Sequence, residues 1–121
     1  MKIANVMPLI ISHDLKKEVA TAESLGCVVK HHFAGKEKYG AEYYVVATAD
    51  GSKVEFLEMD GLDKGFFGWQ FNVEDFDAAV AEYKAKGFKE LRFVRDTEAS
   101  FFALLTDEKG TKISIVNHKK A

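Results

Sequence analysis

An internal repeat constrains the fold of this chain more than any other feature of the sequence. Residues 67–87, FGWQFNVEDFDAAVAEYKAKG, predict a strand with one apolar face and then a helix that begins after Asp75 and ends at Gly87. The same pattern occurs 61 residues earlier, where Asp14 precedes an apolar stripe and Gly26 ends it. A shared cap, stripe and stop predicts two copies of one structural unit.

The remaining patterns complete the two copies. The first copy has predicted strands at 2–11, 27–34, 42–49 and 53–59 and a charged turn at 36–40, and the second has strands at 67–73, 88–95, 101–106 and 112–118. Asp50-Gly51 predicts a two-residue hairpin, and Gly51 matches Gly110 at an offset of 59. Two ferredoxin-like halves are an alternative, but the extra third strand in each copy disfavours them.

The repeat therefore predicts the fold class α+β. We expect a single domain, 1–121, made of two βαβββ modules at 1–60 and 66–121, with residues 60–65 as the link. With a helix on the outer face of each module, the two modules are expected to form a curled mixed sheet around a cavity, which is a suitable architecture for binding.

Composition excludes several classes of partner. Lys and Arg number 17 against 19 Asp and Glu, so the net charge of −2 gives no reason to expect nucleic acid or an anionic membrane. The apolar run at 6–11 is too short for a signal sequence or a membrane span. The single cysteine, Cys27, excludes an intramolecular disulfide and is expected to be a small buried residue. A cytoplasmic protein is the resulting expectation.

Four segments carry a family resemblance: the helix segment 14–26, the run VEDFDAA at 73–79, and the turn-strand segments DGSKVEF at 50–56 and KGTKISI at 109–115. With these motifs the chain resembles the vicinal oxygen chelate superfamily, which includes glyoxalase I, bleomycin resistance proteins, fosfomycin-modifying enzymes and extradiol dioxygenases. The resemblance covers almost the whole chain and implies a homodimer. It specifies no reaction, because one scaffold hosts many chemistries.

The resemblance also implies four positions for the ligands of a divalent metal ion, which fall on Met7, Glu55, Gly68 and Ser114. The offsets of 61 and 59 within the repeat agree with this placement. Only Glu55 is a good ligand for such an ion. Gln70 lies about 6.6 Å further along the strand than Gly68, too far for a simple substitution. We therefore expect no metal and no other cofactor.

Alternation along the strands predicts the residues that line the cavity. The lining is mostly apolar with few polar groups, as in sites for small organic ligands. With a two-residue hairpin at Asp50-Gly51, two residues of the third strand share the face of Glu55. The predicted lining consists of Met7, Leu9, Tyr44, Val46, Glu55, Leu57, Gly68, Gln70, Asn72, Phe101, Ser114 and Val116.

Several of these side chains have a second interpretation. Glu55 is either a general base or an anchor for a cationic ligand, or else a carboxylate on a solvated rim that pairs with Lys53 or Lys112. Trp69 and Phe71 could stack on a ligand, but alternation places them under the helix, where they would pack in the core.

Three functions agree with the sequence, which leaves open whether the protein is an enzyme. The first is a small-molecule-binding protein similar to bleomycin resistance proteins, a metal-free homodimer that does not transform its ligand. The second is a lyase or isomerase that acts on a small oxygenated substrate, with Glu55 as the acid or base and Gln70 or Tyr44 as its polar partner. The third is a ligand-sensing or interaction module.

Overall fold

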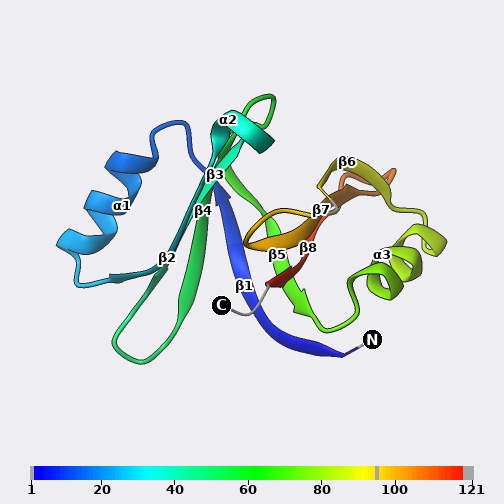
Figure 1. Ribbon diagram of the computed structural model, residues 1–121, viewed down its shortest axis with the longest axis horizontal. Helices are drawn as coiled ribbons and strands as arrows, with labels where there is room; N and C mark the ends of the chain where they lie inside the picture. The colour runs from blue at the N-terminus through cyan, green and yellow to red at the C-terminus, as the bar shows by residue number, and fades with distance from the viewer. Residues whose placement is uncertain (1, 95, 119–121) are drawn as a thin grey trace. The chain divides into compact units, whose positions relative to one another are not determined.

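The computed structural model describes residues 2–94 and 96–118, which form strands and helices in the order that the repeat predicted (Figure 1). Both modules contain a strand, a helix and three further strands, and the first module has a short additional helix. The elements are β1 (Ile3–Ile11), α1 (Leu15–Ser24), β2 (Val28–Gly35), α2 (Lys36–Tyr39), β3 (Ala41–Ala47), β4 (Lys53–Met59), β5 (Gly65–Val73), α3 (Phe76–Ala85), β6 (Lys89–Val94), β7 (Ser100–Thr106) and β8 (Lys112–His118).

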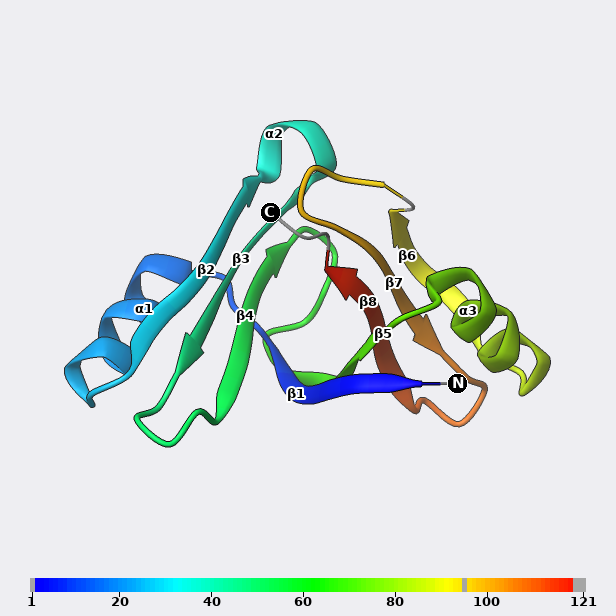
Figure 2. The ribbon, with the colours of Figure 1, turned by 60° about the horizontal axis from the view of Figure 1, so that its bottom comes forward.

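The chain divides into two compact units. One is Met7–Phe67, and the other combines Met1–Val6 with Gly68–Ala121 and is called the Gly68–Ala121 unit below. The strand order is β2-β3-β4-β1 in the first and β5-β8-β7-β6 in the second (Figure 2). In each unit the first and last strands pair in parallel and the other pairs are antiparallel, so the strand pairing in each unit is mixed. The predicted α+β class and βαβββ order are confirmed.

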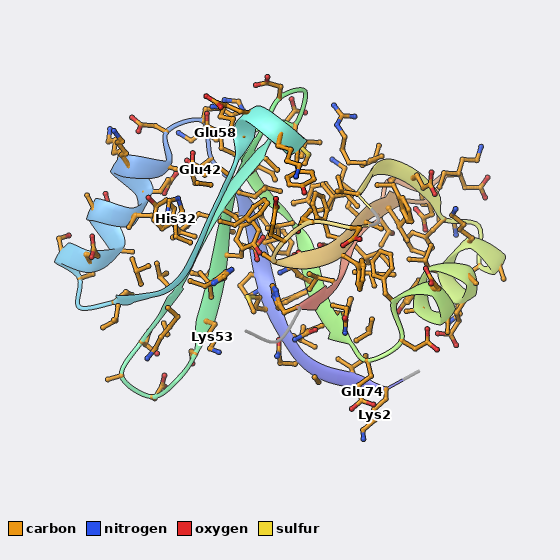
Figure 3. All side chains as sticks on the ribbon, viewed as in Figure 1. Lys2, His32, Glu42, Lys53, Glu58 and Glu74 are labelled. Carbon is orange, nitrogen blue, oxygen red and sulfur yellow. The ribbon has the colours of Figure 1, made fainter. Side chains whose placement is uncertain are left out.

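The start of the chain belongs to the second unit because it is tied to the end of β5. The backbone N–H of Glu74 donates to the carbonyl of Lys2 at 3.3 Å, and the two side chains form an ion pair at 3.4 Å (Figure 3). Both side chains are largely exposed, so the ion pair adds little stability. The backbone hydrogen bond joins the residue before β1 to the residue after β5.

Both long helices begin and end as the sequence predicted. Asp14 accepts a hydrogen bond from the backbone of Lys17 at 3.2 Å, and Asp75 accepts one from Ala78 at 3.0 Å. Gly26 and Gly87 then take φ values of 100° and 98°, a region that glycine reaches without strain. In each case the residue after the glycine donates back to a carbonyl of the last helical turn. The repeat is therefore conserved down to its hydrogen bonds.

Helix α3 packs on one face of its own sheet and forms the core of the Gly68–Ala121 unit. The cluster contains Val73, Phe76, Ala79, Val80, Ala103, Leu105, Ile113 and Ile115, with Phe71 and Phe101 packed against it. Phe71 was correctly predicted to lie under the helix. The same prediction for Trp69 was wrong, because this side chain is 52% exposed and lies outside the cluster. The helix covers only the end of β5 that Phe71 and Val73 occupy.

The β3–β4 hairpin differs by one residue from the two-residue turn that Asp50-Gly51 suggested. The backbone N–H of Thr48 donates to the carbonyl of Ser52 at 2.9 Å, and that of Gly51 donates to Thr48 at 3.0 Å. The loop therefore contains three residues, a type I turn followed by Gly51 at a φ of 93°. A shift of one residue moves every β3 side chain to the opposite face of the sheet.

The β7–β8 hairpin repeats this geometry. Asp107 donates to the carbonyl of Thr111 at 3.1 Å, Gly110 donates to Asp107 at 3.2 Å, and Gly110 has a φ of 83°. Both hairpins therefore have a three-residue loop. In both, the pairing of the two strands differs by one residue from the register that the sequence predicted.

One further element was missed. Residues 36–39, predicted as a charged turn, form the one-turn helix α2, which ends at Gly40 with a φ of 72°. Its Lys36 forms an ion pair with Glu58 of β4. Within the described residues, none of the helices has the length and apolar character needed to cross a membrane.

The hairpin predicts a pH effect. The hydroxyl of Thr48, together with the Ser52 N–H, holds the pKa of the Asp50 carboxyl below its ordinary value. Because the folded pKa is depressed, this contribution to stability is present above about pH 4 and is lost as pH falls through the folded pKa. We expect Thr48→Val to raise the Asp50 pKa, measured by NMR titration of the carboxyl carbon. Thr106→Val, in the other hairpin, serves as the control, and an unchanged Asp50 titration in Thr48→Val would contradict the assignment.

Candidate functional site

The Met7–Phe67 unit has a face opposite to α1, called its non-helix face, that is centred on Glu55. In the register of the sheet, Glu55 of β4 lies beside Leu9 of β1 and opposite Val45 of β3. Leu57 and Tyr43 lie on the same face one step further along. Alternation in β1 correctly placed Leu9 on the face of Glu55 and Leu57. Met7, two residues before Leu9, lies on the same face by the same alternation and is also buried. Glu55 is thus a single carboxylate among mostly apolar side chains.

The burial of Glu55 excludes one of the two interpretations that the sequence left open. The residue is 4% exposed, so it is not a carboxylate on a solvated rim. Placing a carboxylate in apolar surroundings costs free energy unless other groups interact with it, and Glu55 does interact with another residue. An apolar side chain would fill this position at lower cost, which makes Glu55 a candidate for a chemical role.

The register of the β3–β4 hairpin corrects the prediction of which tyrosine shares the face of Glu55. Tyr44 and Val46 were predicted on the face of Glu55, but the three-residue loop puts Tyr43 and Val45 there instead. Tyr43 is buried, and its hydroxyl lies 3.5 Å from Nε2 of His31 on β2. The signal that could have found Tyr43 was the glycine at the last loop position, which is typical of a three-residue hairpin.

Tyr44 lies on the opposite face of the sheet from Glu55, where its side chain contacts other residues. Its ring stacks on that of His32 at a centroid distance of 4.0 Å, and Nε2 of His32 contacts Glu42 at 2.7 Å (Figure 3). These contacts link neighbouring strands on the face that carries α1. Tyr44 is therefore a surface residue of the sheet rather than a partner for Glu55.

The non-helix face of the Gly68–Ala121 unit carries a buried polar pair. Gln70 of β5 lies beside Ser114 of β8, and the Ser114 hydroxyl donates to Oε1 of Gln70 at 2.7 Å. The two residues are 3% and 0% exposed. Asn72 and Val116 follow on the same face, as alternation predicted, and Gly68 precedes them.

The register of β7 corrects one further residue of the predicted lining. Leu104 lies opposite Ser114, and Phe102 lies opposite Val116, so these two residues share the non-helix face. Phe101 was predicted there, but it packs under α3, as does Ala103. The cause is again the three-residue loop, here ending at Gly110.

Gly68 cannot carry a metal ligand without a shift of the backbone. A Cβ atom at this position would lie 2.2 Å from the carbonyl oxygen of Lys112 in β8, far inside van der Waals contact. The side chain beside Ser114 is Gln70, and the equivalent neighbour of Glu55 is Leu9. The close approach of β5 and β8 therefore accounts for the glycine at position 68. This explanation does not depend on metal binding.

The donor atoms in each unit do not fit a divalent metal ion. The non-helix face of the Met7–Phe67 unit offers the Glu55 carboxylate, a thioether at Met7 and, on β2, the His31 imidazole beside the Tyr43 hydroxyl. The same face of the Gly68–Ala121 unit offers an amide and a hydroxyl that bond each other. Across residues 2–94 and 96–118, no group of three or more His, Cys, Asp or Glu could hold a metal.

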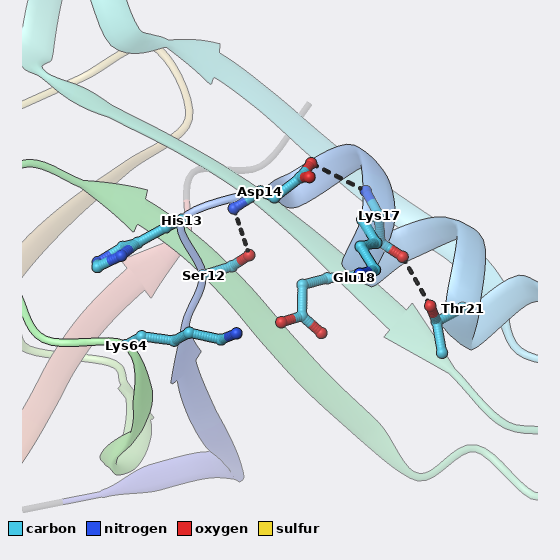
Figure 4. Close-up of a pocket in the computed structure, with 7 residues that line it drawn as sticks. All are labelled: Ser12, His13, Asp14, Lys17, Glu18, Thr21 and Lys64. Carbon is cyan, nitrogen blue, oxygen red and sulfur yellow. Dashed lines mark hydrogen bonds between the residues drawn. The ribbon is translucent and has the colours of Figure 1, made fainter.

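A separate group of surface pockets surrounds His13 at the start of α1. His13 contacts the carbonyl of Leu62 through Nε2 at 2.9 Å, and the pocket in Figure 4 has a volume of about 170 Å³. It is lined by Ser12, His13, Asp14, Lys17, Glu18, Thr21 and Lys64. The hydrogen bonds drawn there join the side chains of Ser12, Asp14 and Thr21 to backbone atoms at the start of α1 and within it, so these three side chains have a structural role.

Comparison with known proteins identifies the fold. No protein-family model matches the chain, and no curated protein matches it. A variant of methylmalonyl-CoA epimerase from Streptomyces coelicolor, in complex with 2-nitronate-propionyl-CoA, has a TM-score of 0.73 at 23% identity, over 98% of this chain and 100% of that chain.

Two further structures give the same result. The methylmalonyl-CoA epimerase from Mycobacterium tuberculosis is similar over 98% of this chain and 90% of that chain, with a TM-score of 0.73 at 15% identity. A hypothetical protein from Bacillus halodurans C-125 is similar over 99% and 96%, with a TM-score of 0.69 at 15% identity.

The chain has the glyoxalase fold of the vicinal oxygen chelate superfamily. Methylmalonyl-CoA epimerases are members of that superfamily, and the resemblance read from the sequence is confirmed at the level of the fold.

The close approach at Gly68 predicts a loss of stability on substitution. Gly68→Ala forces β5 and β8 apart, because its Cβ meets the Lys112 backbone rather than a movable side chain. We expect a decrease of about 1–3 kcal/mol in the free energy of unfolding, measured by urea denaturation. Asn72→Ala, on the same face of the same strand, is the control with a smaller expected loss. An unchanged urea midpoint for Gly68→Ala would contradict the close approach.

Proposed function

We propose that this protein is an isomerase of small carbonyl compounds in which Glu55 is the acid and base. The observation that carries the proposal is the buried carboxylate itself, at the centre of the non-helix face of the Met7–Phe67 unit. An apolar environment weakens competition from water and strengthens the interaction of a carboxylate with a reacting proton.

The fold supports the choice of reaction. Structures of similar fold are named as epimerases of methylmalonyl-CoA, and one of them contains 2-nitronate-propionyl-CoA. A hydrogen on the carbon next to a thioester carbonyl is acidic enough for a positioned carboxylate to remove. Acyl thioesters are therefore the first class of compound to test with this protein.

In the proposed step, the Glu55 carboxylate removes the proton from the carbon next to the carbonyl. The C–H bond breaks, an O–H bond forms on Glu55, and the electron pair passes to the carbonyl oxygen to give an enolate. Return of the proton from Glu55 to the same face restores the starting compound, whereas protonation of the opposite face by water inverts the carbon and completes the isomerisation, with the Glu55 proton passing to solvent. The step needs no oxidant or reductant. A general base of this kind contributes about 10²–10⁴-fold to the rate.

We also propose that the protein works without the metal centre of related enzymes. The donor chemistry of the two units supports this, since Glu55 is the one strong ligand among Met7, Glu55, Gly68 and Ser114. Elemental analysis of protein purified without chelator tests the idea, and one divalent ion per chain would contradict it.

A second candidate is a binding protein similar to bleomycin resistance proteins, which holds a small organic ligand without transforming it. The mostly apolar residues around Glu55, namely Met7, Leu9, Val45 and Leu57, favour this candidate. It predicts saturable binding in equilibrium dialysis together with no turnover. A homodimer in the cytoplasm remains part of both proposals, and sedimentation velocity would test the dimer.

Deuterium exchange distinguishes the two candidates. Methylmalonyl-CoA incubated in D₂O with the protein is expected to gain deuterium next to its thioester carbonyl, as measured by mass spectrometry. Glu55→Gln should slow this exchange by about 10²-fold or more, because the amide cannot accept the proton.

Glu58→Gln is the matched control. Glu58 is also on β4 but lies on the opposite face, where it pairs with Lys36, so its substitution should leave the exchange unchanged. Full exchange activity in a folded Glu55→Gln variant would remove Glu55 from the mechanism. Ligand binding without exchange by the wild type would favour the second candidate.

A further inference from the structure

The nearest neighbours of Glu55 on the non-helix face of the Met7–Phe67 unit are apolar. Leu9 lies beside it on β1, Val45 lies opposite it on β3, and Leu57 follows it by two residues on β4. All three side chains are buried, so they are shielded from water. A group that binds against Glu55 on this face therefore meets hydrocarbon on three sides.

The basic side chains of this face lie towards its edges. Lys53 precedes Glu55 by two residues on β4, and His31 lies on β2, two strands away from β4. Both side chains are exposed. Across residues 2–94 and 96–118, no Lys, Arg or His residue is buried. The described part of the chain therefore holds no buried cation that could neutralise a second negative charge beside Glu55.

The reaction proposed for Glu55 brings the groups on the reacting carbon close to the same side chains. A base that removes a proton from a carbon atom must approach that atom to about 3 Å. Glu55 must also be anionic to accept the proton. A carboxylate on the same carbon would therefore place a second negative charge next to the first, in apolar surroundings that screen charges poorly.

We propose that the substrate is a thioester of a monocarboxylic acid whose reacting carbon carries an apolar branch, rather than a thioester with a free carboxylate on that carbon. The proposal rests on the proposed function for the reaction and for the role of Glu55. An apolar branch gains contact with Leu9, Val45 and Leu57 and leaves their shielding from water intact. A carboxylate would lose its hydration against the same side chains.

This substrate class differs from the one named for structures of similar fold. Two of those structures are named as methylmalonyl-CoA epimerases, and methylmalonyl-CoA carries a free carboxylate on the carbon next to the thioester. Their sequence identities to this chain are 23% and 15%. A shared fold at this identity does not imply a shared substrate, because side chains in the site decide which compound binds.

Deuterium exchange by the wild-type protein is the first test, because it needs no variant. The rates for 2-methylbutyryl-CoA and methylmalonyl-CoA in D₂O are measured by mass spectrometry, and each is divided by its rate without protein. The two compounds differ at the reacting carbon, which carries an ethyl group in one and a carboxylate in the other. We expect the enhancement to be at least about 10-fold greater for 2-methylbutyryl-CoA, because like charges side by side are strongly unfavourable.

The outcomes separate this inference from the proposed function. An equal or greater enhancement for methylmalonyl-CoA would overturn the inference while the proposed function stands. Exchange above the protein-free rate in neither compound would overturn both.

Val45→Thr tests whether the apolar neighbours determine the preference. Threonine has nearly the shape of valine and adds a hydroxyl group opposite Glu55, where it can donate to a carboxylate. We expect the preference for 2-methylbutyryl-CoA to fall about 2-fold to 10-fold. Val46→Thr is the matched control, because Val46 is also buried but lies on the opposite face, so the preference should be unchanged. An equal change in both variants, or no change in Val45→Thr, would overturn the role of these neighbours.

Discussion

Two glycines with positive φ determine the register on which each sheet depends. Gly51 and Gly110 close three-residue loops, and a loop of that length pairs residue 45 with residue 55 and residue 104 with residue 114. Because side chains alternate along a strand, loop length alone decides which face each residue of β3 and β7 occupies. Tyr43, Leu104 and their neighbours reach the non-helix faces for this reason, and Ala103 reaches the core under α3.

The parallel pairs at the centre of each unit place the polar residues. β1 pairs with β4 and β5 with β8 in equivalent registers, which sets Glu55 beside Leu9 and Ser114 beside Gln70. The two units thus carry different chemistry at equivalent places, a carboxylate in one and a neutral hydrogen-bonded pair in the other. Burial makes both costly for stability, and we interpret that cost as a sign of function.

The sequence predicted the modules well because their signals are local. Asp14 and Asp75 cap helices, Gly26 and Gly87 end them, and strands such as 53–59 follow from alternation over a few residues. Within β1, β4, β5 and β8, alternation also placed Leu9, Glu55, Gln70 and Ser114 on the correct faces. The predictions failed where two strands had to be aligned, as for Tyr44, Val46 and Phe101, since a turn that is one residue longer reverses the faces.

The sequence by itself determined the repeat, the α+β class and the face of its strand on which Glu55 lies, since caps, glycines and alternation act over short distances. It left the burial of that carboxylate open, and the structure decided it. Only the tertiary structure decided that Gly68 is pressed against the backbone of Lys112, that Gln70 rather than Gly68 lies beside Ser114, and that Trp69 lies beyond the reach of α3. Each of these depends on the distance between strands that are remote in sequence, and that distance is fixed by pairing and packing rather than by any local pattern.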